Sequence, residues 1–249
     1  MPVSKNKVDR NFQDIFRCGT DVSTHAPGKI EVLGNHTDYN EGFGLSTTAE
    51  FRTCFDLELY DYRKFEVIDK IKIPSDYVFV IVNSMVKHAF TESDYNLRKE
   101  SCKRAVECIK KKYPQIKALR DVSPAILRNT KRLMDFTDYK RASHIVSEND
   151  LVLKGMEALK NSNIELFGSY LYLSHESSRK NFENSCPELD YLVELSKSIP
   201  GCVGARLSGR GFGGISIHLV KKKEADRYKI RIATTFKLQT NIEPQIIIL

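Results

Sequence analysis

Three polar residues suited to holding a hydroxylated ligand lie close together near the start of the chain. The stretch APGKIEVLGNHTDYNEGFG, residues 26–44, places Asn35, His36 and Asp38 among turn glycines and apolar residues. Amide, imidazole and carboxylate groups offer donors and acceptors to neighbouring hydroxyls, which is how proteins commonly hold a sugar. The alternative is a turn in which Asn35 and Asp38 bond only to the backbone, and spacing alone favours this alternative.

These side chains depend on a strand-rich segment over residues 26–60. KIEVLG and STTAEFRTCFDLELYDY are typical of strands, with turn residues between them. The run YVFVIVNS at 77–84 predicts a buried strand, because it is short and almost entirely apolar. Apolar residues recurring at helical spacing predict helices at about 96–113, 139–161, 163–178 and 188–199.

The periodicity changes after residue 200. CVGARLSG and GGISIHLV predict two strands joined by a glycine-containing hairpin, followed by a helix near 222–236 and a final strand, PQIIIL. From residue 77 the order is strand, several helices, strand, strand, helix, strand. This is the split β-α-β order of a ferredoxin-like domain with a helical insertion. We therefore expect an α+β protein, with a strand-rich piece at 1–76 and a ferredoxin-like domain at 77–249.

Composition restricts the class of protein. The 249 residues, 41% hydrophobic and 29% charged, are enough to bury a core. No apolar run is long enough to cross a bilayer, and MPVSKNKVDRNF lacks the apolar block of a secretory signal. We therefore expect a cytoplasmic protein that does not bind a membrane.

Cysteine spacing and charge restrict the partners. The six cysteines form no CxxC pair and no metal-ligand spacing, so we expect free thiols and no metal site. The net charge of +7 suits an anionic partner. The lysine runs at 110–112 and 221–223, however, are typical of solvated helix faces, and no basic–aromatic interleaving is present. We therefore expect no nucleic-acid partner.

The complete string at 26–44 resembles the first signature of the galactokinases, which are GHMP small-molecule kinases. That signature reads approximately APGR-x-N-hydrophobic-hydrophobic-GEHTDYN-x-GF. The resemblance implies that His36 and Asp38 bind sugar hydroxyls and that Asn35 occupies the position of the family's sugar-binding glutamate. It also implies a catalytic role for Lys29, which stands where the family has an arginine beside the catalytic base. Lysine keeps the charge but loses the planar fork of arginine.

Later segments resemble the same family in the same order. VNSMVKHAFTESDYNLRKESC, residues 82–102, places Tyr95 at the position of a tyrosine that reaches the sugar. GARLSGRGFGG resembles the third signature, normally GARMTGGGFGG, whose glycines let the backbone pass close to the phosphate-binding loop. The resemblance therefore implies that three glycines lie near phosphate: Gly209, Gly211 and Gly213. Arg210 replaces a family glycine, and either a clash with the backbone or a cation near phosphate is compatible with the sequence.

The resemblance is interrupted between residues 50 and 77. Family members carry there a central segment with the second signature, P-x-G-x-GLSSSAA, whose loop cradles the ATP phosphates, and a CGIMDQ-like stretch whose aspartate activates the sugar hydroxyl. None of the 13 glycines in this chain lies in a serine-rich loop that opens a helix. The resemblance thus implies a truncated GHMP-kinase N-terminal piece, of the ribosomal S5 domain 2-like type, before the ferredoxin-like domain.

This gap bears on the reaction. ATP and Mg²⁺ are implied as cofactors, but phosphoryl transfer depends on holding phosphates, metal and nucleophile in line. Without the cradle and the base, we expect that this chain does not phosphorylate a sugar by itself.

Three hypotheses for function remain open. The first is a galactokinase by descent, which would transfer the γ-phosphate of ATP to the C1 hydroxyl of galactose, with a mis-assembled gene or a skipped exon explaining the gap. The second is a non-catalytic pseudokinase that senses galactose or a related sugar, or docks to a protein partner. The third is a GHMP kinase for another sugar. We interpret His144 as a packed histidine, and His175, Glu176 and Ser177 as helical neighbours that diverge.

Overall fold

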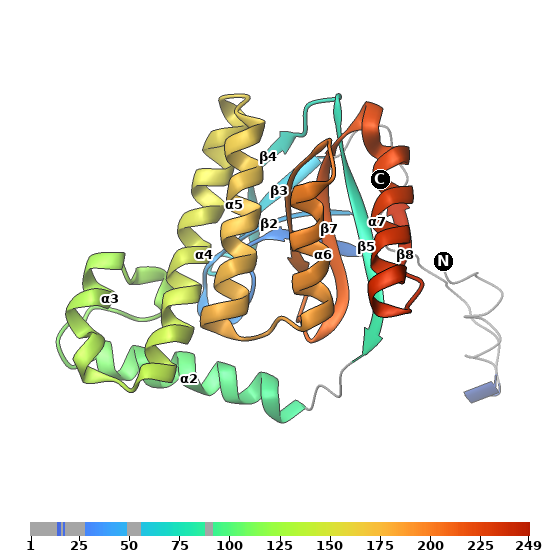
Figure 1. Cartoon of the computed structure of the whole chain (residues 1–249). Coiled ribbons are helices and arrows are strands. Elements are labelled where there is room, and N and C mark those ends of the chain that lie inside the picture. Colours follow the sequence, from blue (N-terminus) through green and yellow to red (C-terminus); the bar gives the residue numbers. More distant parts are fainter. Residues whose placement is uncertain (1–13, 16, 18–27, 49–55, 88–91) are drawn as a thin grey trace.

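The computed structural model describes residues 14, 15, 17, 28–48, 56–87 and 92–249. Within these ranges the chain forms two antiparallel sheets and a set of helices, shown in Figure 1. The helices α4 (Phe136–Lys160) and α5 (Ile164–Ser177) pack against each other, whereas α6 (Pro187–Ser198) and α7 (Ala225–Thr240) cover the same face of the strand β5 (Tyr77–Lys87). The helices α2 and α3 extend to the lower left, away from both sheets.

The first sheet carries the motif at 26–44 and has the strand order β1-β2-β3-β4. Its strands are β1 (Lys29–Leu33), β2 (Phe43–Thr48), β3 (Asp56–Asp61) and β4 (Glu66–Lys72). Residues alternate between the faces of a strand. Leu45, Leu57 and Leu59 accordingly point into the core, whereas Glu58 and Tyr60 are only partly buried. The strand β4 was not among the predicted strands, and residues 49–55 of the strand-like run STTAEFRTCFDLELYDY lie outside the described residues.

The second sheet confirms the predicted ferredoxin-like arrangement, because its antiparallel order is β6-β7-β5-β8. Its strands are β5 (Tyr77–Lys87), β6 (Cys202–Ser208), β7 (Gly213–Lys221) and β8 (Gln245–Ile248). The first strand of this unit pairs with the third and the last, as the split β-α-β order requires. The α+β prediction is therefore confirmed.

In the described part of the helical insertion between β5 and β6, four α-helices match the predicted ones closely, and a fifth, α3, was not predicted. The α-helices of the insertion are α2 (Glu92–Lys110), α3 (Pro124–Thr130), α4 (Phe136–Lys160), α5 (Ile164–Ser177) and α6 (Pro187–Ser198). Asp135 caps α4 by accepting a hydrogen bond from the backbone N–H of Asp138 at 2.9 Å. The helix α7 (Ala225–Thr240) joins β7 to β8.

Short helical turns complete the chain, and one of them is π-helical. They are η1 (Asp38–Asn40), η2 (Leu119–Asp121), η3 (Lys131–Leu133), η4 (Ser178–Phe182) and η5 (Lys222–Glu224). The π-turn η4 directly follows α5 and ends at Glu183, which adopts a left-handed conformation with φ 56°. Single π-turns of this kind are frequent at functional sites.

One hydrophobic core joins both sheets. Leu45 and Leu57 from the first sheet, Phe79 and Ile217 from the second, and Phe167 from α5 are all buried in the same cluster. The division into pieces at 1–76 and 77–249 stays a prediction.

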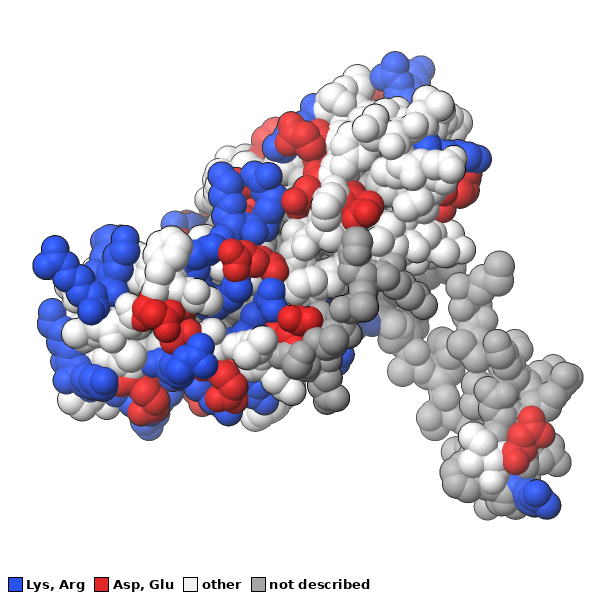
Figure 2. Space-filling view, turned by 60° about the horizontal axis from the view of Figure 1, so that its bottom comes forward, with Lys and Arg blue, Asp and Glu red and all other residues white. Residues whose placement is uncertain are grey.

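For the lysine run at 110–112, the surface charges agree with the interpretation as a solvated helix face. Figure 2 shows Lys and Arg gathered over the α2–α3 part, with Asp and Glu side chains among them. Lys103 pairs with Glu100, and Lys110 with Glu107. No helix in the described parts of the chain is long and apolar enough to cross a membrane.

Candidate functional site

Thr37 and Asn40, rather than Asn35 and Asp38, make the side-chain hydrogen bonds that close the turn between β1 and η1. The Thr37 hydroxyl lies 2.7 Å from the Gly34 carbonyl oxygen and 2.6 Å from that of Phe43. The Asn40 amide donates to the His36 carbonyl oxygen at 2.9 Å. The alternative that Asn35 and Asp38 only stabilise a local turn is therefore wrong for Asn35, whose side chain bonds to distant parts of the chain.

Asn35 is the centre of a buried hydrogen-bond network and is 1% exposed. Its Nδ2 donates to Oε1 of Glu31 at 2.9 Å and to the Gly209 carbonyl oxygen at 2.8 Å. Its Oδ1 accepts from Nδ2 of Asn184 at 2.9 Å. The amide thereby joins β1, the loop after β6 and the segment that follows η4.

A buried ionic group supports the turn from below. Oε2 of Glu148, on α4, accepts the backbone N–H groups of Gly34 at 3.1 Å and Asn35 at 2.9 Å. Arg206, on β6, lies with Nη1 3.9 Å from the same oxygen and with Nη2 3.4 Å from Oε1 of Glu31. Glu148 and Arg206 are both 0% exposed. Burial raises the pKa of Glu31, against the lowering effects of Arg206 and the Asn35 hydrogen bond.

His36 lies in an aromatic cluster built from three separate elements. Its ring centroid is 4.5 Å from Phe182 of η4, 5.8 Å from Tyr39 of η1 and 5.9 Å from Tyr95 of α2. Burial, followed by the nearby His144, lowers the pKa of His36 to about 3, so the ring is neutral at pH 7. Its Nε2 donates to the Arg210 carbonyl oxygen at 3.4 Å, and Nδ1 faces the Tyr39 hydroxyl at 3.3 Å.

Asp38 and Tyr95 form the outer part of the same site. Asp38 is exposed and Tyr95 is half-buried. Burial, and after it the charge of Asp38, raises the pKa of Tyr95, while Arg210 opposes the change. The guanidinium carbon of Arg210 lies 5.4 Å from the centre of the Tyr95 ring. The structure thus brings Asp38, Tyr95 and Arg210 together at the surface above His36.

Lys29 lies on the face of the first sheet that carries Tyr60 and Tyr62. Its Nζ donates to the Tyr62 hydroxyl at 2.9 Å and lies 5.5 Å and 5.2 Å from the two ring centres. The amine therefore already has a hydrogen-bond partner and two aromatic neighbours.

The glycine loop between β6 and β7 is attached to the motif at 26–44. Gly209, Gly211 and Gly213 all have positive φ, at 81°, 85° and 113°. A Cβ at Gly211 would collide with the Asn184 carbonyl oxygen, which also accepts the Phe212 N–H at 2.8 Å. The loop fits Arg210 without the clash that the sequence left open, because its side chain extends outward over Tyr95.

Neither the glycine loop nor the N-terminus of α4 fits the phosphates of ATP. The glycine loop precedes a strand rather than a helix, and the N-terminus of α4 is capped by an acidic residue, Asp135. A helix N-terminus that holds phosphate leaves its N–H groups free for the anion. No group of three or more His, Cys, Asp or Glu in the described parts is arranged to hold a metal ion.

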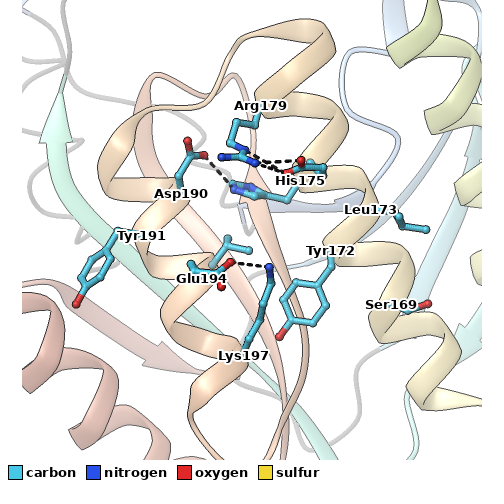
Figure 3. Close-up of a pocket in the computed structure, with 11 residues that line it drawn as sticks. Ser169, Tyr172, Leu173, His175, Arg179, Asp190, Tyr191, Glu194 and Lys197 are labelled. Carbon is cyan, nitrogen blue, oxygen red and sulfur yellow. Dashed lines mark hydrogen bonds and ion pairs between the residues drawn. The ribbon is translucent and has the colours of Figure 1, made fainter.

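A large cavity lies elsewhere, between α5 and α6, with a volume of about 760 Å³ (Figure 3). Nε2 of His175 faces Oδ1 of Asp190 at 3.1 Å, and Nδ1 accepts the Leu207 N–H at 3.3 Å. The two cations that line the cavity are likewise paired, Arg179 with Glu176 and Lys197 with Glu194. His175 and Asp190 therefore join α5, α6 and β6.

Sequence reasoning missed four residues that the site depends on: Glu31, Glu148, Asn184 and Arg206. One signal was present for Glu148, which lies three positions after Ile145 and four before Val152, on the apolar face of α4. A charged residue on such a face indicates a buried partner. The expectation for His144 was correct, since it is buried with Nδ1 3.0 Å from the Ser177 hydroxyl.

Comparisons with known proteins point to one family at both ends of the chain. Residues 10–55 match the family described as the galactokinase galactose-binding signature, and residues 156–235 match the GHMP kinases C terminal family. The galactokinase of Glaesserella parasuis serovar 5 is 38% identical over 191 residues, covering 75% of this chain and 48% of that protein. The galactokinase of Actinobacillus succinogenes is 39% identical over 193 residues, with 75% and 48% covered.

The chain thus spans about half the length of the curated relatives that it matches. Among solved structures, the crystal structure of Lactococcus lactis galactokinase complexed with galactose matches with a TM-score of 0.82. Sequence identity in this match is 18%, and 98% of this chain and 97% of that chain are covered. At this identity, the match shows a shared fold.

Proposed function

We propose, because this chain belongs to the galactokinase family of GHMP kinases, that the β1–η1 turn and the residues around it bind galactose. The observation that carries the proposal is the meeting of His36, Asp38 and Tyr95 at one place. Tyr95 comes from α2, far from the turn in sequence, yet its ring centroid lies 5.9 Å from that of His36.

The chemistry of this place suits a sugar. The exposed Asp38 carboxylate can accept hydrogen bonds from two neighbouring hydroxyls, and the Tyr95 ring offers an apolar face beside it. Sugar sites combine such polar groups with aromatic surface. The neutral ring of His36 lies beneath Asp38 and Tyr95. The buried Glu148 and Arg206 stabilise the turn.

We further propose that this chain binds the sugar without phosphorylating it. Neither the glycine loop nor the N-terminus of α4 offers a cradle for the ATP phosphates, and Lys29, the residue proposed for catalysis, is bonded to Tyr62. When bound, ATP and Mg²⁺ supply the phosphoryl group and its charge neutralisation in kinases of this class.

Calorimetric titration of the purified protein tests binding. We expect heat with galactose at millimolar concentration, and weaker binding to glucose, which differs at one hydroxyl. Asp38→Asn should weaken binding about tenfold, since hydrogen bonds to a charged group contribute about 1.5–3 kcal/mol. Asp226→Asn, on the exposed face of α7, is the matched control. No heat with any galactose concentration would overturn the proposal, and ADP production in a coupled assay would overturn the absence of catalysis.

Arg210 supports a second candidate ligand, a sugar that carries an anionic group. Its exposed guanidinium lies over Tyr95, and no ion pair to it occurs among the residues that the structure describes. Including galacturonic acid in the titration decides between the two, because a cation at the site favours the carboxylate form.

Two further assignments remain proposals. We propose a cytoplasmic location, supported by free thiols at Cys102, Cys108, Cys186 and Cys202. We also propose that residues 1–76 correspond to the N-terminal piece of the family fold and residues 77–249 to its C-terminal domain.

A further inference from the structure

We infer that Glu31, rather than Asn35, is the residue of this network that accepts a sugar hydroxyl, and that Asn35 is a positioning residue that holds Glu31. This inference rests on the proposed galactose binding. It changes the role that the sequence resemblance implied for Asn35, and it adds a residue that the resemblance did not single out.

The bonds of Asn35 leave its side chain little capacity for a ligand. Both Nδ2 hydrogens are used, one by Glu31 and one by the Gly209 carbonyl oxygen. Oδ1 accepts from Asn184, and the backbone N–H is held by Glu148. The Gly209 carbonyl can only accept and the Asn184 amide donates at the other end, so the network fixes the orientation of the amide. At 1% exposure, Asn35 can bind a ligand only by breaking these bonds.

Glu31 has the capacity that Asn35 lacks. Its Oε1 is bonded to Asn35 and faces Arg206, while no bond to Oε2 is found within the described ranges. Its side chain is 22% exposed, and it lies two positions after Lys29, so both side chains leave β1 on the same face. A carboxylate oxygen has two acceptor positions, so Oε2 is available to a donor hydroxyl.

The surrounding charges support this role. Arg206 is fully buried and lies between Glu31 and Glu148, so one guanidinium partly compensates two carboxylates. Burial is the largest cause of the raised pKa of Glu31, and a third carboxylate, that of Asp38, adds to it. An excess of acceptors over donors suits a ligand that brings several hydroxyl hydrogens.

The sequence pattern contains the same pair in reverse. The galactokinase signature has asparagine at the position of Glu31 and glutamate at the position of Asn35. In this chain the two side chains lie in direct hydrogen-bond contact. The carboxylate and the amide have thus exchanged positions while the pair between strand and turn is kept.

Galactose titrations of the two single exchanges and the double exchange test the inference. We expect Glu31→Asn and Asn35→Glu each to weaken binding at least tenfold, because the first removes the acceptor and the second places two carboxylates side by side. The double exchange E31N/N35E should bind within about threefold of the wild type. A merely structural role for Glu31 would not predict this rescue.

A second variant distinguishes the loss of a hydrogen-bond acceptor from misfolding. Glu31→Gln has nearly the same shape, and should also weaken galactose binding about tenfold while its circular dichroism spectrum stays unchanged. Titrating the 2-, 3-, 4- and 6-deoxygalactoses then identifies the hydroxyl. Its removal should weaken binding to the wild type but not to Glu31→Gln. Glu58→Gln is the matched control, because Glu58 lies on the same face of the sheet and opposes Ser46, the residue that also opposes Glu31.

The outcomes separate the inference from the proposed function. No galactose binding by the wild type overturns both. Binding by the wild type with unchanged affinity in Glu31→Gln overturns the inference alone, and so does a double exchange no better than the single exchanges.

Discussion

Glu148 and Asn35 are 113 positions apart in sequence, yet Oε2 of Glu148 accepts the backbone N–H of Asn35 at 2.9 Å. The same oxygen also accepts the N–H of Gly34, so a carboxylate from α4 fixes the turn that follows β1. Arg206, on β6, lies with Nη1 3.9 Å from this oxygen. The turn with the sugar motif is therefore held by a fully buried ionic group that connects both sheets to the helical insertion.

Removing the charge of Glu148 should destabilise the protein strongly. Glu148→Gln leaves Arg206 without one of its two carboxylates, in surroundings where both residues are 0% exposed. Breaking a buried pair from one side typically costs about 3–5 kcal/mol of unfolding free energy. Urea unfolding followed by circular dichroism measures the loss. Glu157→Gln, on the exposed face of the same helix, should change the unfolding free energy by less than about 0.5 kcal/mol. Equal effects of the two substitutions would contradict this account.

Two glycines of one loop should respond differently to alanine. Gly209 and Gly211 both have positive φ, so alanine at either position costs about 1–2 kcal/mol from backbone conformation. A Cβ at Gly209 meets nothing within 4 Å, whereas at Gly211 it collides with the Asn184 carbonyl oxygen. We expect Gly211→Ala to lower the melting temperature at least twice as much as Gly209→Ala. A smaller effect at Gly211 would show that the loop does not press against Asn184.

Stability should fall as the pH drops below 6.5, because three buried histidines resist protonation. The pKa values of His36, His144 and His218 are each lowered from 6.5 to about 3, with burial as the largest cause. The unfolded chain therefore binds more protons between these values, so stability is fully present above pH 6.5 and is lost progressively towards pH 3. Each histidine contributes up to about 1.4 kcal/mol per pH unit in this window.

Urea midpoints between pH 7.5 and 4.5 measure this dependence. His218→Gln, which removes a ring bonded to Ser216 and Tyr228, should reduce the slope by up to about 1.4 kcal/mol per pH unit. The raised pKa of Glu31 acts in the opposite direction, but it is common to both proteins and cancels in their comparison. An identical slope in the variant would show that His218 does not contribute to the pH dependence of stability.

Arg210 should contribute little to stability. Its side chain is exposed and contacts the Tyr95 ring at 5.4 Å, a cation–π geometry that contributes about 0.5–1 kcal/mol at exposed sites. Arg210→Ala should therefore lower the unfolding free energy by no more than about 1 kcal/mol. Arg206→Ala, four positions earlier but fully buried, should cost several times as much. A large loss with Arg210→Ala would place this side chain in the folded core.

Local patterns in the sequence were sufficient for most of the architecture. The apolar run at 77–84, the helical spacing after residue 96 and the two glycine-flanked strands after residue 200 predicted the elements in their correct order. That order admits few topologies, and the ferredoxin-like arrangement was among them. The first signature likewise located the proposed sugar site, because strand and turn residues there are neighbours in sequence. The strand β4 was missed because EVIDKIK alternates weakly and is largely exposed.

Only the tertiary structure decided how the site is held. Whether Asn35 is free or saturated depends on Gly209 and Asn184, which are 174 and 149 positions away. Whether Arg210 clashes or extends outward depends on the position of Tyr95 on a separate helix. Such contacts follow from packing of the core and have no local period, so no pattern along the chain reports them. The sequence by itself determined which elements form and where a sugar motif lies, and the packing decided which of its side chains remain available.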